Sequence, residues 1–299
     1  MNKKLYWGYA MVITSAILYG CMGLITTHIY QQDITRETAV FMRNFLAIPF
    51  LAVLAWKQHG FKASAFRICW KTLPMTSAIA LLGCCITPLL LFSAYNSIGT
   101  GPTTVFHFIY PALVVLLSWL FLRKTINGKT VLALVICIGG IALFYNPADP
   151  LNLTGCGLAL LSGLTYAVYV VLLSVFKNKD VSSFKLSFYV SVICAAAMLA
   201  ICLVTDTLTL PTNATGWLLC ILLALVVNVG AMVLFQQGTA IAGGERASIL
   251  STAEPLTSMI TGYLFLGETG NLNPRSIIGS VLVIAASILI AVADKGKAE

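Results

Sequence analysis

Charge is the scarcest feature of this sequence. Of its 299 residues only 9% are charged, 18 basic and 10 acidic, whereas 59% are hydrophobic. A soluble domain carries about 25% charged residues because its surface faces water. The chain has too few charges to cover a soluble globule, and its mean hydropathy of +0.93 indicates a membrane protein with several spans.

Motifs of catalysis and metal binding are missing as well. The nine cysteines show no C-x-x-C spacing, which would favour a zinc or redox site. Residues 127–130 (NGKT) resemble the end of a P-loop, but Arg123 stands where the first glycine is required. The five aspartates fall outside the apolar runs, and no G-x-S-x-G motif occurs. We therefore expect no enzyme activity, no cofactor and no metal site.

Long apolar runs make up most of the chain. A transmembrane helix needs about 20 mostly apolar residues to cross about 30 Å of hydrocarbon. Ten runs meet this requirement, at about 7–30, 38–56, 72–95, 102–122, 129–145, 155–176, 184–205, 216–239, 248–266 and 276–293. Their short connections leave no room for a soluble domain, so we predict an all-α polytopic membrane protein with ten transmembrane helices.

The net charge is +8. The distribution of the basic residues along the chain indicates the membrane topology and does not indicate a nucleic-acid partner. With ten spans and a cytoplasmic N-terminus, one side of the membrane receives Lys3, Lys4, Lys57, Lys62, Arg67, Lys71, Arg123, Lys124, Lys129, Lys177, Lys179, Lys185, Arg246, Lys295 and Lys297. This positive-inside asymmetry places both termini in the cytoplasm. We expect the lipid bilayer as a partner and no nucleic acid.

Three segments are written twice. Residues 254–268 (EPLTSMITGYLFLGE) match 110–124 (YPALVVLLSWLFLRK), with the proline in the same place. Residues 233–242 (VLFQQGTAIA) match 90–99 (LLFSAYNSIG). A third match, of 154–167 (TGCGLALLSGLTYA) with 7–20 (WGYAMVITSAILYG), makes Tyr166 the counterpart of Tyr19. The offsets of 144, 143 and 147 residues indicate two copies of one five-span unit.

The repeat divides the chain into a first unit, 1–146, and a second, 147–299. Because five is odd, the second unit enters the membrane from the opposite side. Inverted repeats of this kind are a recurrent plan of secondary transporters, with the substrate site near the bilayer midplane between the halves.

These residues resemble a known family. The five-plus-five plan, the segment from Pro255 to Glu268 and the Gly139-Gly140 pair are similar to the EamA-type transporters of the drug/metabolite transporter superfamily. The resemblance covers essentially the full length and implies a carrier whose central cavity is lined by both halves. One departure is visible: the first copy usually ends its fourth span with glutamate, where this chain has Lys124.

The resemblance implies a secondary, non-ATP exporter of amino acids, related metabolites or drugs, which works by alternating access. We expect it in a bacterial inner membrane, with a small molecule as its substrate. The alternative is a non-transporting multi-pass receptor or an intramembrane enzyme. A monomer and an oligomer both stay open.

Two ionisable residues inside the apolar runs need an explanation, because such groups are costly in hydrocarbon. Glu254, directly before Pro255, could bind a cationic group, take up a proton for coupled transport, or stabilise its own helix. Arg43 could recognise a substrate carboxylate, pair with Glu268, or extend its long side chain to the outer interface.

Aromatic and amide side chains complete the candidate site. His107 and Tyr110, the positional twin of Glu254, could form a hydrogen-bonding wall for a substrate or bond between helices. Tyr19 and Tyr166 occupy equivalent positions of the two repeats, near the middle of their spans. A buried tyrosine hydroxyl needs a hydrogen-bond partner, which a water-filled cavity would supply. The predicted substrate-binding residues are Tyr19, Asn96, His107, Tyr110, Tyr166, Asn228, Gln237 and Glu254. A gating or structural role is predicted for Arg43, Pro111, Pro255 and Glu268.

Overall fold

The computed structural model describes residues 3–62, 66–123, 128–143, 152–176, 181–251, 253–268 and 273–293, and within these ranges it contains helices and no strand. The first half of the chain forms α1 (Lys3–Gly20), α2 (Met22–Tyr30), α3 (Arg36–Phe45), α4 (Ala47–Gln58), α5 (Leu73–Ala80), α6 (Thr87–Ile98), α7 (Thr100–His107), α8 (Tyr110–Leu122) and α9 (Gly128–Ala142). The second half forms α10 (Leu153–Val175), α11 (Ser183–Val204), α12 (Ala214–Leu223), α13 (Met232–Ala242), α14 (Gly244–Leu250), α15 (Ala253–Leu266) and α16 (Pro274–Ala293).

Seven helical stretches in the described part of the chain are long and apolar enough to cross a membrane. They are Leu5–Tyr30, Arg36–Gln58, Trp70–Ile98, Thr100–Leu122, Leu153–Val175, Ser183–Val204 and Ala214–Ala242. Two shorter apolar helices, Val131–Gly140 and Ile277–Ala286, lie within α9 and α16. The predicted span 248–266 is divided between α14 and α15. The all-helical prediction is confirmed, whereas the count of ten spans stays a prediction.

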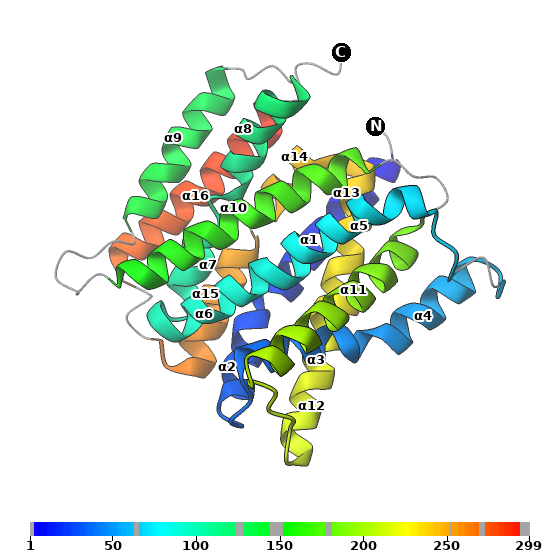
Figure 1. Cartoon of the computed structure of the whole chain (residues 1–299). Coiled ribbons are helices and arrows are strands. Elements are labelled where there is room, and N and C mark those ends of the chain that lie inside the picture. The colour runs from blue at the N-terminus through cyan, green and yellow to red at the C-terminus, as the bar shows by residue number, and fades with distance from the viewer. Residues whose placement is uncertain are drawn as a thin grey trace.

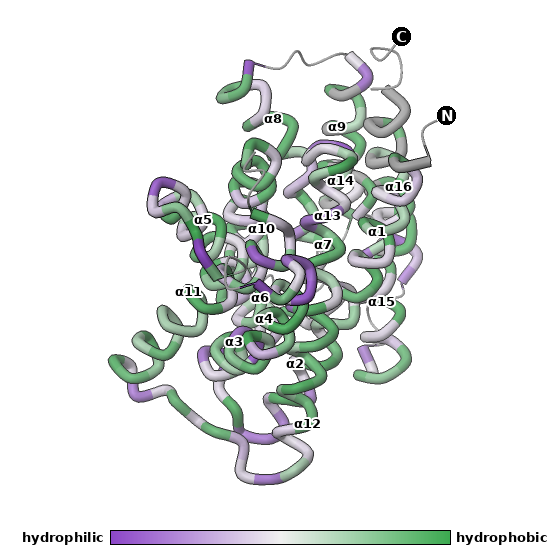
Figure 2. The backbone as a smooth tube through the Cα atoms, turned by 90° about the vertical axis from the view of Figure 1, so that its right-hand side faces the viewer, coloured by the Kyte–Doolittle hydropathy of each residue, from purple (hydrophilic) through white to green (hydrophobic). Residues whose placement is uncertain are grey.

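The outer surface of the bundle is apolar. Val204, Phe121 and Leu264 expose 86%, 70% and 62% of their area. Hydrophobic residues cover the helices along their length, and hydrophilic ones gather mainly in the connections (Figure 2). Soluble proteins rarely expose contiguous apolar surface of this extent, so these side chains face lipid.

The helices form one bundle in which segments far apart in the sequence lie side by side (Figure 1). α1 packs against α13 and α15, α10 against α6 and α8, and α9 against α16. Each half of the chain therefore contributes to the centre of the bundle. α1 begins and α16 ends at the same end of the molecule, which we call the α1 end.

Two π-helical segments interrupt long helices at matching places. Leu81–Ile86 joins α5 to α6 and Ala224–Ala231 joins α12 to α13, 143 residues further on. In the first, the Thr87 hydroxyl donates to the carbonyl five residues earlier at 2.7 Å. In the second, Ser15 of α1 donates to the Ala231 carbonyl at 2.7 Å. Such bulges occur frequently at functional sites, and the first of these segments borders the cavity described below.

Small residues let α10 approach the centre closely. Ala159, Gly163 and Ala167 are buried on one face of this helix. A Cβ atom on Gly163 would lie 2.6 Å from the carbonyl oxygen of His107, a backbone atom that cannot rotate away. Gly163 therefore determines how closely α10 packs against the chain between α7 and α8.

We expect Gly163→Ala to destabilise the protein by about 1–3 kcal/mol, the usual cost of overpacking. The matched control is Gly157→Ala in the same helix, where nothing lies within 4 Å of the added Cβ. That control gains about 1 kcal/mol of helix propensity. Thermal unfolding of both variants in detergent tests this, and equal unfolding temperatures would contradict the close approach.

Candidate functional site

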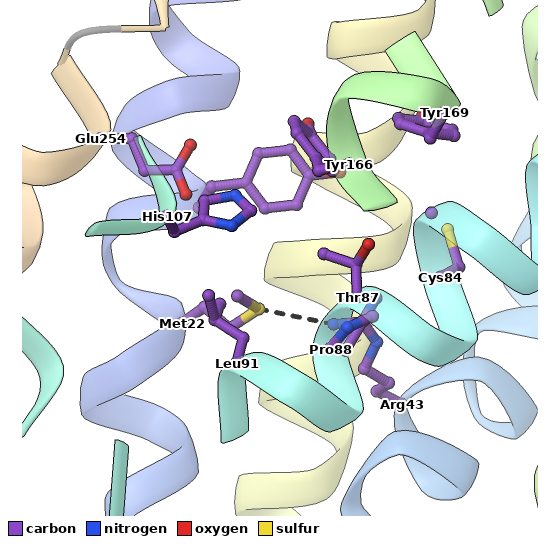
Figure 3. A pocket seen from close by; sticks show the side chains of 12 residues that line it. Met22, Arg43, Cys84, Thr87, Pro88, Leu91, His107, Tyr166, Tyr169 and Glu254 are labelled. Atoms are coloured by element: carbon purple, nitrogen blue, oxygen red, sulfur yellow. Dashed lines mark hydrogen bonds between the residues drawn. The ribbon is translucent and has the colours of Figure 1, made fainter. Parts of the chain in front are cut away.

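A small cavity of about 30 Å³ lies inside the bundle, and Figure 3 shows the side chains that line it. Its walls come from both halves of the chain. The first half contributes α1, α2, α3, α6 and α7, and the second half contributes α10 and α15. The lining residues are Tyr19, Met22, Arg43, Gly83, Cys84, Thr87, Pro88, Leu91, His107, Tyr166, Tyr169 and Glu254. Small-molecule sites in proteins are typically about 300–1,000 Å³, so the cavity is nearly closed in this conformation and must widen before it can enclose a solute.

A buried cation and a buried carboxyl group face this cavity from opposite sides. Arg43 exposes 3% of its area and Glu254 exposes 5%. Figure 3 shows Glu254 beside His107 and Arg43 across the cavity beyond Thr87. Among the described residues the one ion pair is Arg36–Glu37, which lies outside the cavity. The two cavity charges are therefore not paired with each other.

Arg43 is held by soft partners. Its Nη1 donates to the Met22 sulfur at 3.4 Å, and its guanidinium lies 6.0 Å from the centre of the Phe92 ring. Its Nε has no hydrogen-bond partner. In this structure the side chain is buried in the bundle and is not paired with Glu268, and recognition of a substrate carboxylate stays a prediction.

Glu254 lies in the first turn of α15, where the chain starts a new helix after the break that follows α14. Its backbone N–H donates to the Ser251 carbonyl at 3.0 Å. A carboxylate near a helix N-terminus is favoured by the helix dipole. Pro255 stands in the same first turn, and Pro111 likewise begins α8. Both prolines therefore stand in the first turn of a helix, where a missing N–H costs nothing, and Pro111 does so within the apolar stretch Thr100–Leu122.

An aromatic wall separates Glu254 from the far side of α10. The Tyr166 ring lies 5.3 Å from His107, 4.7 Å from Tyr110 and 5.2 Å from Tyr169, centre to centre. His107 Nδ1 and the Ser162 hydroxyl of α10 are 2.8 Å apart. These contacts fix the imidazole and the Tyr166 ring against each other and leave their edges on the cavity.

The structure brings five of the predicted residues to the cavity and leaves others away from it. Tyr19, Arg43, His107, Tyr166 and Glu254 line it. Tyr110 is fully buried behind Tyr166 and donates to the Ser248 carbonyl at 3.5 Å.

The three predicted amide residues do not line the cavity. Asn96 is exposed on α6. Asn228 is buried in the second π-helical segment and donates to Asn44 at 2.8 Å. Gln237 is half-buried, because its neighbour Gln236 takes the inward direction on α13 and accepts from Ser187 at 2.9 Å. One residue along a helix is about 100°, so one of two adjacent glutamines must turn away.

Glu268 contacts α7 rather than Arg43. Its carboxylate accepts from the Thr100 backbone N–H at 2.8 Å, the Thr100 hydroxyl at 3.0 Å and the Gly101 N–H at 3.2 Å. Gly267, with φ of 67°, ends α15 and turns Glu268 toward α7. Glu268 therefore joins the end of α15 to the start of α7. Its sequence counterpart Lys124 lies outside the described residues.

Sequence reasoning missed Met22, Gly83, Cys84, Thr87, Pro88, Leu91 and Tyr169. Most of these are apolar or small and carry no signal of their own. The Thr-Pro pair at 87–88, which follows the first π-helical segment, is the one feature that could have directed attention to this part of α6.

Comparisons with known proteins agree with this architecture. The model of the EamA-like transporter family matches residues 6–146 and 153–292. An uncharacterized transporter of Archaeoglobus fulgidus is 28% identical over 95% of this chain and 96% of its own length. An uncharacterized inner membrane transporter of Salmonella typhimurium, YicL, is 24% identical over 97% of each chain.

A crystal structure of a protein 16% identical in sequence superposes with a TM-score of 0.70, over 98% of this chain and 99% of that chain. At that identity the similarity shows the fold alone. Together with the apolar helices, these matches identify an integral membrane protein of the transporter class.

Proposed function

The chain belongs to the EamA-like transporter family, and on that premise we propose that it carries a small zwitterionic solute, an amino acid or a related metabolite, across the membrane. The observation that carries this proposal is the placement of Arg43 and Glu254, buried on opposite sides of one cavity and not paired with each other. Two uncompensated charges in a low-dielectric interior are costly. A solute with a carboxylate at one end and an ammonium group at the other would compensate both.

The rest of the cavity fits such a solute. Thr87 and His107 offer hydrogen bonds between the two charges, and Tyr166 offers an aromatic edge. Arg is suited to the carboxylate because its planar fork binds two oxygens at once. We infer that the carboxylate lies toward α3 and the amine toward α15.

Alternating access follows from the repeat that the sequence predicts. We propose that units 1–146 and 147–299 form two inverted five-span halves, ten spans in all, with both termini in the cytoplasm and net export. The π-helical segments 143 residues apart, and Gly99 and Gly243, which end α6 and α13 with φ of 80° and 87°, support a shared plan. Two similar halves give inward-open and outward-open states of similar energy.

Glu254 is the proposed proton-coupling group, because it can bind either the substrate amine or a proton. With purified protein in liposomes and the membrane potential clamped to zero, a gradient of one pH unit should accumulate a neutral zwitterion up to about tenfold, since one unit corresponds to 1.36 kcal/mol. In Glu254→Gln, which holds the site neutral, accumulation should fall to the level seen without a gradient. A panel of labelled amino acids identifies the substrate for this assay.

The control is Glu37→Gln, a carboxyl paired with Arg36 outside the cavity, which should leave accumulation unchanged. Gradient-driven flux that survives in Glu254→Gln would refute proton coupling. If no zwitterion were carried by the wild-type protein, the transport proposal itself would be wrong.

A further inference from the structure

A second group of buried polar side chains lies beyond the cavity, between α10, α11 and α13. We call it the inner polar cluster, and it consists of Tyr169, Ser187, Ser191, Gln236 and Thr239. Each of these residues exposes at most 2% of its area. Apart from Tyr169, its residues do not line the cavity that holds Arg43 and Glu254.

The cluster has more polar atoms than internal hydrogen bonds. The Ser187 hydroxyl donates to Gln236 Oε1 at 2.9 Å. Ser191 Oγ and Thr239 Oγ1 have no hydrogen-bond partner, and the Tyr169 hydroxyl and Gln236 Nε2, whose side chains lie near each other, have none within 3.5 Å; these are four of the seven such atoms in the described part of the chain. An unsatisfied buried polar atom costs about 1–3 kcal/mol. Four of them together indicate a region that meets water or a polar solute in another state of the protein.

Tyr169 is the boundary between the cluster and the cavity. It lines the cavity, and its ring stacks on Phe235 of α13 with 6.3 Å between centres. The ring also lies so close to Gly83 that a Cβ atom there would overlap it. Gly83 belongs to the first π-helical segment, so the ring lies between the two halves of the chain.

The cluster leads toward the α1 end of the bundle. Tyr169 and Gln236 each lie six residues before the end of their helix, and Ser187 lies four residues after the start of α11. At 1.5 Å per residue these side chains are about 6–9 Å from the ends of their helices. Those helix ends lie at the α1 end of the molecule (Figure 1), the side on which the N-terminus is placed.

We propose that the inner polar cluster lines the access path between the cavity and the membrane side of the N-terminus, and that the Tyr169 ring closes this path. The proposal rests on the transport function argued above. All five side chains of the cluster are uncharged, so they would offer hydrogen bonds to a passing zwitterion without trapping either of its charges. Opening requires the Tyr169 ring to leave Gly83, which a movement of α6 relative to α10 would produce.

Ser191 and its neighbour Val190 provide a matched test, because both are fully buried at the same depth on α11. In a transport-competent variant without native cysteines, Ser191→Cys and Val190→Cys are exposed to a charged, membrane-impermeant methanethiosulfonate reagent in liposomes. From the side of the N-terminus, the cysteine at 191 should react at least tenfold faster than the cysteine at 190. From the other side both should react slowly. Tyr169→Ala should open the cluster to the cavity and so accelerate the reaction at 191 from the other side, which stays slow while the Tyr169 ring is in place.

The outcomes separate this proposal from the transport function, since the same liposomes are assayed for solute exchange. Equal rates at 190 and 191 in a protein that transports would overturn the access path and leave the transport function standing. Fast reaction at 191 from the opposite side would also overturn it. Fast reaction from the N-terminal side without any exchange would support an aqueous path and refute transport.

Discussion

Replacing Arg43 by glutamine should raise the dissociation constant for a zwitterionic substrate about 100-fold. Arg43 is 3% exposed and has no carboxylate partner among the described residues, so the substrate would be its counter-ion. Removing one member of a buried charge pair costs about 2–5 kcal/mol, and about 1.4 kcal/mol is tenfold in affinity. Isothermal titration of the detergent-solubilised protein measures the change directly.

The design separates recognition from packing. A decarboxylated amine of the same skeleton should bind the wild-type protein weakly and lose less than about threefold affinity in Arg43→Gln, because it makes no bond to the guanidinium. Arg36 pairs with Glu37 outside the cavity. Arg36→Gln is therefore the control, and it should leave the affinity for both ligands unchanged. If both ligands lost affinity equally in Arg43→Gln, the arginine would act on the structure, through Met22 and Phe92, and not on the carboxylate.

The sequence predicts the charged part of the site because charge is so scarce in it. A carboxyl and a guanidinium inside apolar runs are conspicuous whatever the fold, and Glu254 and Arg43 both line the cavity. The aromatic twins Tyr19 and Tyr166 were found through the repeat, which relates mid-span positions in the two halves. These predictions depended on residue type and offset and required no knowledge of helix orientation.

Neutral polar residues were predicted less well, because residue type does not say which face of a helix they occupy. Gln236 and Gln237 are chemically identical, and only the packing of α13 against α11 selects the first. The π-helical segments add a further difficulty, because each shifts the angular position of every later residue in its helix. Asn96, ten residues beyond the first segment, turns outward on α6.

Long-range partners lie beyond sequence reasoning altogether. The sequence pattern marks Glu268 as the end of the repeated segment, yet its partners Thr100 and Gly101 are 168 and 167 residues away. The bonds depend on the left-handed turn at Gly267 and on the start of α7 lying beside the end of α15. Only the assembled bundle brings these two helix ends together.

The contact between Glu268 and α7 supports a second prediction of large effect. The carboxylate receives two backbone N–H groups and a hydroxyl at a helix N-terminus, a place where negative charge is favoured. It joins α15 of the second half to α7 of the first, at the end of the bundle opposite the α1 end. We propose that this contact keeps the cavity closed toward that side.

Glu268→Ala should therefore open the cavity to the side opposite the N-terminus. Hydrogen bonds to a charged group contribute about 1.5–3 kcal/mol, which converts to a shift of about 10- to 100-fold in a two-state equilibrium. Cys84 reports on it, because it lines the cavity and is buried. In a variant that keeps Cys84 alone among the cysteines, its reaction with a membrane-impermeant thiol reagent from that side should accelerate by the same factor.

Thr261→Val is the matched control on α15, because the Thr261 hydroxyl bonds only within its own helix, to the carbonyls of Thr257 and Ser258. It should leave the rate at Cys84 unchanged. Glu268→Gln keeps a hydrogen-bond acceptor but loses the charge. Its reaction rate at Cys84 should lie between the rates of the wild type and of Glu268→Ala. A lower unfolding temperature in Glu268→Ala with an unchanged rate at Cys84 would mean that the carboxylate only stabilises the helix ends. Faster reaction with an unchanged unfolding temperature requires instead that the contact differs in energy between the two access states, which is the property a gate must have.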